Sequence, residues 1–358
     1  MTVQAQPTVR PEAVVRAAAL AHVRFSRRDP EAMARFLVDF GFVALGGGFF
    51  RAHGDGAPWA VEVVTGSEDA FLGCAFAAER EEDLQIFADA VGSSLTALDA
   101  PGGGRCVKTV DPSGYEVQLV FGAEQANAIS DPTNPFPVNG PGLAIRVNET
   151  VRPSIAPAPV FKLGHVVLQT PNFQATSEWY MRHFGLIPTD VQYLPDESPI
   201  LGFYRLNRGD TPTDHHTLAL LAGGEPRLLH VSTETSTIDA LGQGQHHLKT
   251  QGWTHFWGIG RHELGSQIFD YWKDSVGDEW EHYIDGDMMT IDYPTGHHRL
   301  SRGGLWTWGH DLPDSMRPDL PIEAVPDIHA AGGFGSMTID QATGFIEAMK
   351  APPRAWLK

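Results

Sequence analysis

The chain has 358 residues, of which 42% are hydrophobic and 20% charged, and its formal net charge is −18. This composition is typical of a globular protein long enough for two domains, and the acidic balance argues against nucleic acid or an anionic membrane as a partner. The two cysteines, Cys74 and Cys106, disfavour a disulfide framework and a cysteine-based zinc site. No apolar run reaches the length of about 18 residues that a membrane span needs, and the chain does not open with a signal-peptide pattern. We therefore expect a cytoplasmic protein.

A repeated pattern appears twice along the chain. Residues 20–42 (LAHVRFSRRDPEAMARFLVDFGF) and 163–186 (LGHVVLQTPNFQATSEWYMRHFGL) each begin as a strand with histidine at the third position and continue as a helix that ends in Phe-Gly. Further along, residues 111–120 and 274–283 each form a turn with glycine at the fourth position, followed by a strand pattern. The repeat predicts two related copies of one domain.

Each copy subdivides again into two units. Residues 71–92 open a second strand–helix unit in the first copy, and residues 227–252 do so in the second copy. Because one such unit cannot close a hydrophobic core by itself, the units should pair. We predict an α+β fold with four βαβββ modules in two tandem domains, residues 15–123 and 160–300, each a curved mixed sheet that forms a cup.

Two further segments lie outside the repeat. Residues 124–158 are rich in proline and asparagine, which predicts a linker. Residues 301–358 read as an extended, proline-punctuated arm with a helix at 338–350. We expect this arm, and in particular its segment WTWGH (306–310), to fold over the second cup as a lid that excludes water.

Three polar side chains interrupt the apolar strands of the second copy. His165 lies on its first strand, His230 lies on the strand LLHV that opens its second unit, and Glu281 lies on its last strand. If the two units pair about a pseudo-twofold axis, all three side chains point into one cavity. Two imidazoles and one carboxylate form the facial triad that suits non-haem Fe(II).

Each of these residues also has a simpler interpretation. A single histidine on a strand is more often a hydrogen-bonded core residue than a metal ligand. A buried carboxylate such as Glu281 is costly unless it is neutralised, and a salt bridge from Arg261 or Lys273 would serve as well as a metal ion.

Other reactive side chains occur near the triad. The segment TDHHTLALL (213–221) places His215 and His216 at adjacent, opposite-facing strand positions, so one of them should face the cavity. His262 and Tyr271 are nine residues apart and flank ELGSQIFD. The simpler alternatives are a surface histidine pair, a loop histidine and ordinary aromatic packing.

Together these residues resemble the type I extradiol ring-cleaving dioxygenases of the vicinal oxygen chelate superfamily. The family signature runs from a tyrosine through an acidic residue, a proline and a glycine to a glutamate ten residues after the tyrosine. This chain matches it with Tyr271, Asp274, Gly277 and Glu281 and departs from it at Ser275, where proline is usual. The resemblance spans residues 15–300 and includes His165 in GHVVL, His216 in HHTLA, His230, and His262 in GRH.

The resemblance implies a role for each matched residue. His165, His230 and Glu281 would bind Fe(II), or Mn(II) through the same donors. His216 would act as the acid–base residue, and His262 and Tyr271 would contact the substrate hydroxyls or the bound oxygen. We also expect Trp306 to contact the substrate, whereas a carboxylated substrate would call for Arg299 or Arg302.

The first copy lacks most of this set. His22 is retained, but Gln118 stands at the position of Glu281, and Gly73–Cys74 match the region of His230. We therefore predict a vestigial first domain that binds no metal.

The implied activity is ring opening next to the diol of a catechol-type aromatic, with O2 as the second substrate, in a homo-oligomer of between two and eight subunits. Two alternatives stay open. One is a non-oxidative metalloenzyme of the glyoxalase type, and the other is an aromatic-ligand-binding protein on the same fold. The pattern does not distinguish monocyclic, bicyclic and carboxylated catechols.

Overall fold

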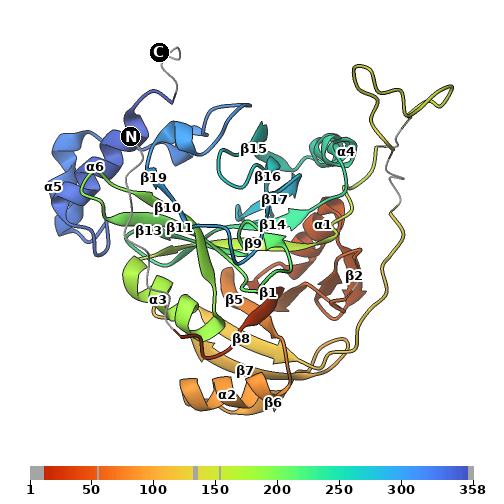
Figure 1. The fold of residues 1–358 in the computed structure, drawn as a ribbon, viewed down its shortest axis with the longest axis horizontal. Helices are drawn as coiled ribbons and strands as arrows, with labels where there is room; N and C mark the ends of the chain where they lie inside the picture. The colour runs from red at the N-terminus through yellow and green to blue at the C-terminus, as the bar shows by residue number, and fades with distance from the viewer. Residues whose placement is uncertain (1–11, 55, 132–135, 153–154, 354–358) are drawn as a thin grey trace.

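The computed structural model describes residues 12–54, 56–131, 136–152 and 155–353 and contains two large sheets, one in each half of the chain (Figure 1). The first sheet has eight strands in the order β2-β3-β4-β1-β5-β8-β7-β6. Its central strands β1 and β5 are antiparallel, and each belongs to a different βαβββ unit. The elements of this half are β1 (Ala17–Arg27), α1 (Pro30–Phe40), β2 (Val43–Gly46), β3 (Phe49–Arg51), β4 (Val61–Thr65), β5 (Ala70–Ala78), α2 (Glu82–Val91), β6 (Leu95–Ala97), β7 (Arg105–Val110) and β8 (Glu116–Phe121).

The second sheet repeats this plan with one added edge strand, in the order β15-β16-β17-β14-β9-β13-β11-β10-β19. Its central strands β9 and β14 are again antiparallel and again come from different units. A separate two-stranded sheet joins β12 and β18. The elements of this half are β9 (Lys162–Thr170), α3 (Phe173–Phe184), β10 (Ile187–Tyr193), β11 (Pro199–Arg205), β12 (Thr213–Asp214), β13 (Leu218–Ala222), β14 (Arg227–Glu234), α4 (Ile238–Thr250), β15 (Thr254–Arg261), β16 (Ile268–Lys273), β17 (Glu279–Ile284), β18 (Met288–Met289) and β19 (Gly296–Arg299).

This arrangement confirms the predicted α+β fold of four paired βαβββ modules. The repeated Phe-Gly is the end of a helix in both copies, because Gly41 and Gly185 cap the C-termini of α1 and α3 in the left-handed conformation. At Gly41 the backbone passes so close to its neighbour that an added Cβ would lie 1.7 Å from the carbonyl oxygen of Ala158. Only glycine fits at this position.

The two halves share one buried core and are joined by buried polar contacts. Arg27 of β1 is fully buried and pairs with Asp274 at 2.9 Å and with Asp278 at 2.5 Å. His282 of β17 donates a hydrogen bond to the carbonyl oxygen of Phe40 at 2.7 Å. We propose that the two sheets correspond to the two predicted domains. Of the predicted linker, residues 132–135 and 153–154 lie outside the described residues.

The C-terminal arm packs beside β10 and β19 (blue, Figure 1). The helix expected at 338–350 is present as α6 (Ile339–Lys350), which begins with a capping box at Thr338. The rest of the arm is more helical than the expected extended segment, because its prolines stand at the starts of short helical turns rather than along an extended run. These turns are η1 (Arg302–Gly304), η2 (Asp314–Met316), η3 (Ile322–Ala324) and α5 (Val325–Ala330). Among the described residues, every helix is too short or too polar to cross a bilayer.

Candidate metal centre

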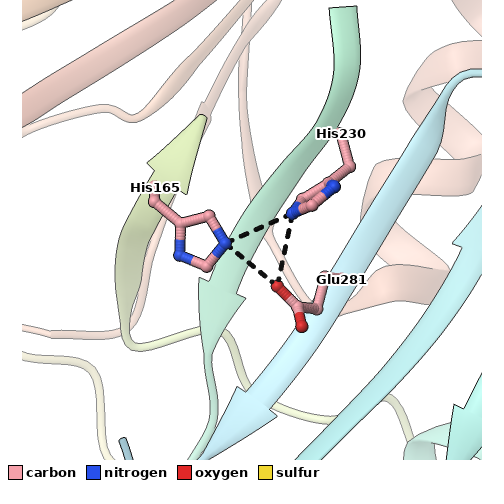
Figure 2. A group of neighbouring side chains, drawn as sticks. All are labelled: His165, His230 and Glu281. Carbon is pink, nitrogen blue, oxygen red and sulfur yellow. Dashed lines mark hydrogen bonds and ion pairs between the residues drawn. The ribbon is translucent and has the colours of Figure 1, made fainter. Parts of the chain in front are cut away.

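Three neighbouring strands at the middle of the second sheet bring His165, His230 and Glu281 together (Figure 2). In strand register, Ser232 of β14 lies opposite His165 of β9 on one side and opposite Glu281 of β17 on the other. His230 is two residues from Ser232 and therefore projects from the same face of the sheet. Positions far apart in the chain thus converge because their strands are adjacent.

The donor atoms of these three residues are spaced as ligands of one ion would be. His165 Nε2 lies 3.2 Å from His230 Nε2 and 3.2 Å from Glu281 Oε2, and His230 Nε2 lies 3.7 Å from Glu281 Oε2. Ligands bound at right angles and at about 2.0–2.2 Å from a metal are separated by roughly 3 Å. The three residues therefore fit a common divalent ion.

The charge of the site also fits a cation. Glu281 is fully buried. Burial tends to raise its pKa, but hydrogen bonds from His165 and His262 outweigh burial and hold the pKa well below its usual range, so the side chain is a carboxylate. Burial lowers the pKa of His230 to about 3, so its imidazole is neutral. A buried carboxylate next to the neutral ring of His230 is stabilised by a positive charge nearby.

Neither of the two cations considered from the sequence supplies that charge. Arg261 pairs with Asp285 at 2.8 Å, and Lys273 lies 3.9 Å from Glu279. The interpretation that Arg261 or Lys273 forms a salt bridge with Glu281 is therefore wrong. The spacing of residues along the sequence does not predict where such long side chains point.

His262 and Tyr271 lie on the other side of the carboxylate. His262 Nε2 is 3.2 Å from Glu281 Oε1 and 3.0 Å from the Tyr271 hydroxyl. His262 Nδ1 donates to the carbonyl oxygen of Leu305 at 2.7 Å, which ties the C-terminal arm to the site. Burial, together with the charge of Glu281, raises the pKa of Tyr271 well above its usual value, so its hydroxyl keeps its proton.

His215 and His216 occupy a bend between β12 and β13 instead of the predicted strand positions. The two rings are hydrogen-bonded to each other through their Nδ1 atoms at 3.0 Å, and of the pair His216 lines the cavity whereas His215 reaches Asp190. Both are buried, which also excludes a surface pair. The His216 ring lies against that of His165, with 3.9 Å between centroids.

Sequence reasoning missed two residues that hold this group in place. The Ser232 hydroxyl donates to Glu281 Oε2, and the Asp190 carboxylate accepts a 2.6 Å hydrogen bond from His215 Nε2. The alternation of β14 could have shown that Ser232 faces the cavity with His230. No local signal connects Asp190 to His215, since 25 residues separate them.

A cavity of about 380 Å³ opens onto these side chains. Its wall is mostly apolar, and the C-terminal arm covers part of it. The lining includes His165, His216, His230, His262, Tyr271, Trp257, Leu201, Phe203, Leu221, Leu264, Leu300, Leu305, Met316, Phe345 and Met349, with Arg227, Lys273 and Glu279 also present.

Three residues expected at the substrate lie elsewhere. Trp306 is buried in the core between the arm and the second sheet and is not among the residues that line the cavity, whereas its neighbour Leu305 is. Arg302 pairs with Asp311 at 3.2 Å, and Arg299 is exposed. The direction of a side chain in an irregular arm changes from one residue to the next, so the sequence could not place them. Arg227 and Lys273 are the cations that line the cavity.

Comparisons with known proteins agree with this architecture. Metapyrocatechase 2 from Cupriavidus necator is 28% identical over 206 residues, which are 57% of this chain and 60% of that protein. Two solved structures have similar folds. The Mn(II)-bound glyoxalase from Novosphingobium aromaticivorans has a TM-score of 0.69 at 22% identity and covers 86% of this chain and 96% of its own. An extradiol ring-cleaving dioxygenase from Brevibacterium fuscum has a TM-score of 0.68 at 18% identity and covers 88% and 84%.

The aligned segment is less than two thirds of the length of the curated relative, and no family model matches the chain. The structural likeness covers both copies of the repeat. The resemblance noted from the sequence is thus confirmed, and the chain has the vicinal oxygen chelate fold of the extradiol dioxygenases.

Proposed function

We propose that this protein is an Fe(II)-dependent extradiol dioxygenase that inserts O2 next to the diol of a catechol-type aromatic and opens the ring. The observation that carries this proposal is the convergence of His165, His230 and Glu281 at one point of a cavity. The sequence similarity to metapyrocatechase 2 supports it.

In this proposal His165, His230 and Glu281 are the metal ligands. When bound, Fe(II) would supply the electron transfer that overcomes the spin barrier between O2 and a singlet catechol. Two neutral imidazoles and one carboxylate balance only one of the two positive charges of the ion. A monoanionic catecholate would bring the buried site close to neutrality, which limits the cost of burying charge.

His216 would move a proton between substrate and oxygen. It lines the same cavity as the ligands, and burial together with the nearby His165 keeps its pKa well below the usual value for histidine, so the free ring is neutral and has one nitrogen without a proton. Having accepted the proton from the diol, it can return that proton to oxygen as the ring opens.

Tyr271 and His262 would orient the diol. The Tyr271 hydroxyl keeps its proton and can donate a hydrogen bond to a substrate oxygen, which favours the monoanion. The apolar wall formed by Leu201, Phe203 and the arm would hold the aromatic ring and exclude water. A homo-oligomeric assembly stays a prediction.

A second candidate is a non-oxidative metalloenzyme, because the Mn(II)-bound glyoxalase from Novosphingobium aromaticivorans has a similar fold. The triad suits Mn(II) as well as Fe(II). The presence of His216, His262 and Tyr271 favours the dioxygenase. A diol substrate needs side chains that accept its proton and bind its two hydroxyl groups, and these three residues can do so.

The test is oxygen uptake with metal analysis on the same sample. The protein is loaded anaerobically with Fe(II), mixed with a panel of monocyclic, bicyclic and carboxylated catechols, and then exposed to O2. We expect stoichiometric oxygen uptake and a yellow ring-opened product with at least one catechol. Full iron occupancy without oxygen uptake across the panel would reject the dioxygenase, and parallel loading with Mn(II) and an α-ketoaldehyde–thiol adduct tests the alternative.

A further inference from the structure

A buried chain of hydrogen bonds connects His216 to the far edge of the second sheet. His216 Nδ1 lies 3.0 Å from His215 Nδ1, and His215 Nε2 lies 2.6 Å from Asp190 Oδ2. The other oxygen of Asp190 accepts from His298 Nε2 at 2.8 Å. The chain therefore runs from the cavity wall through β10 to β19, and its inner members, His215 and Asp190, are buried.

Where His215 carries a single ring proton, these contacts determine which nitrogen of His216 is protonated. A carboxylate only accepts hydrogen bonds, so His215 Nε2 must be the protonated nitrogen that donates to Asp190. The Nδ1 of a neutral His215 is then a lone pair, and the hydrogen bond at this end must come from His216 Nδ1–H. The remaining nitrogen of His216, Nε2, is left without a proton and available to the cavity.

We propose that Asp190 and His215 are positioning residues that hold His216 in the tautomer whose Nε2 is a free base facing the substrate. This inference rests on the proposed function, since the tautomer matters for catalysis only if His216 accepts a proton from the substrate. It assigns a role to two residues outside the metal-binding and substrate-binding set.

Two hydrogen bonds, from His215 and from His298, stabilise the negative charge of Asp190. Burial tends to raise its pKa, but hydrogen bonds from His215 and His298 outweigh burial and lower it, so the side chain is a carboxylate. The hydrogen bond to Asp190 raises the pKa of His298 at the other end. The anion therefore stays an acceptor for His215.

A purely structural role is the competing explanation, because Asp190 also joins β10 to β19 through His298. Variants of His215 separate the two explanations better than variants of Asp190. Leucine and asparagine have nearly the same shape, and both remove the contact with Asp190. Only asparagine keeps an oxygen that can accept from His216 Nδ1–H.

The experiment compares His215→Leu and His215→Asn in the full-length, iron-loaded protein. We expect His215→Leu to lower kcat by about 10- to 100-fold, as is usual for residues that orient a functional group, with KM and iron content unchanged. His215→Asn should recover most of that loss. The matched control is His297→Gln, whose neighbour is His298 but whose Nδ1 bonds to the Tyr193 hydroxyl, and it should keep the wild-type kcat.

A second readout does not depend on activity. In protein labelled with ¹⁵N-histidine and loaded with diamagnetic Zn(II), the His216 resonances, assigned by their loss in His216→Phe, should report a protonated Nδ1 in the wild type and in His215→Asn. They should report a protonated Nε2 in His215→Leu. A protonated Nε2 in the wild type, or equal kcat in the two His215 variants, overturns the proposal. If the wild type consumes no oxygen, the proposed function fails, but the NMR result still decides the tautomer.

Discussion

The two cups of this molecule have the same strand plan and different chemistry. In each, a histidine on the central strand lies in register with a small residue on the neighbouring strand, His22 with Ala75 and His165 with Ser232. The last strand of each cup then places Gln118 next to Ala75 and Glu281 next to Ser232. The two sheets thus contain equivalent positions, and the two cups differ in the side chains at those positions.

The equivalence extends to the position of His216, the proposed acid–base residue. Strand register relates Trp59 to His216, since each lies two residues before the strand residue that pairs next to the central histidine, Val61 with Val23 and Leu218 with Val166. The Trp59 ring stacks on His22 with 3.9 Å between centroids, the same separation as between His216 and His165. An aromatic ring at this position therefore satisfies packing, and we propose that the imidazole of His216 adds proton transfer.

The position of His230 is where the two cups differ most in backbone. His230 is two residues before Ser232, and the equivalent residue, two before Ala75, is Gly73. Gly73 has φ +145°, and an added Cβ would lie 1.9 Å from the carbonyl oxygen of Glu116. The backbone at this position excludes a histidine, so a single substitution cannot rebuild the triad. That the first cup binds no metal stays a prediction.

The largest expected effect is that of Glu281→Gln, which gives the second cup the glutamine that the first cup has at this position, Gln118. Removing the only anionic ligand should abolish metal retention and turnover together, a loss of more than about 100-fold in affinity, because even residues that only support ligands contribute 10- to 100-fold. Iron analysis after anaerobic loading and desalting measures it. His22→Gln, at the equivalent central position of the first cup, should leave iron content unchanged. Wild-type iron in Glu281→Gln would remove this residue from the ligand set.

His216→Phe compares the two cups at the proposed acid–base position, where the first cup has Trp59. A phenyl ring can stack on His165 as Trp59 stacks on His22, so the variant should fold and keep its iron. It should lose about 10²- to 10⁴-fold in kcat, the usual contribution of general acid–base catalysis. Oxygen uptake per bound iron is the measurement, and unchanged turnover would exclude His216 from proton transfer.

The parts of the fold and site that follow a repeating pattern could be predicted from the sequence. The alternation of apolar residues along the strands singled out His165, His230 and Glu281 as candidate ligands, and the Phe-Gly pairs predicted the ends of two helices. Both signals are local in the sequence. Their convergence followed from the pairing of strands, which the internal repeat indicated.

The rest depends on contacts that no local pattern records. His215 turns toward Asp190 because a bend separates β12 from β13. In the arm, Leu305 lines the cavity while Trp306 faces the core, since irregular backbone has no periodicity to fix direction. Arg227 was missed because an exposed arginine at a strand end looks like any surface charge.

Arg27→Met tests how much the buried ion pair between the two cups contributes to the stability of the protein. The substitution leaves Asp274 buried without its cation, so we expect the free energy of unfolding to fall by about 3 kcal/mol. Urea titration measures the loss. The control is Arg28→Met, whose side chain is 70% exposed beside Asp69 and should change stability by less than about 0.5 kcal/mol. Equal effects at residues 27 and 28 would show that the buried pair does not stabilise the junction.

His22→Gln should change the acid sensitivity of the protein. Burial, with repulsion from Arg24, lowers the pKa of His22 to about 3, whereas the unfolded chain titrates near its ordinary value of 6.5. Between these values the unfolded state binds a proton that the folded state does not, so wild-type stability falls as pH falls, by up to about 1.4 kcal/mol per pH unit from this residue. Glutamine cannot titrate, so the difference in unfolding free energy between pH 7.5 and pH 5.0 should shrink by about 2 kcal/mol, the slope taken from pH 6.5 to pH 5.0. Parallel profiles would show that folding does not lower the pKa of His22.

The smallest effects concern the arm, which only the second cup possesses. Phe345→Ala removes an aromatic ring from the cavity wall and should raise KM for the best catechol about 5- to 10-fold, the effect of losing about 1 kcal/mol of apolar contact. Trp306→Phe alters a residue of the arm whose side chain lies in the core and not on the cavity wall, so its KM should stay within about twofold of the wild type. Steady-state oxygen uptake gives both values. If Trp306→Phe raises KM and Phe345→Ala does not, the tryptophan rather than the apolar wall contacts the substrate, and the arm must sit differently over the site when substrate is bound.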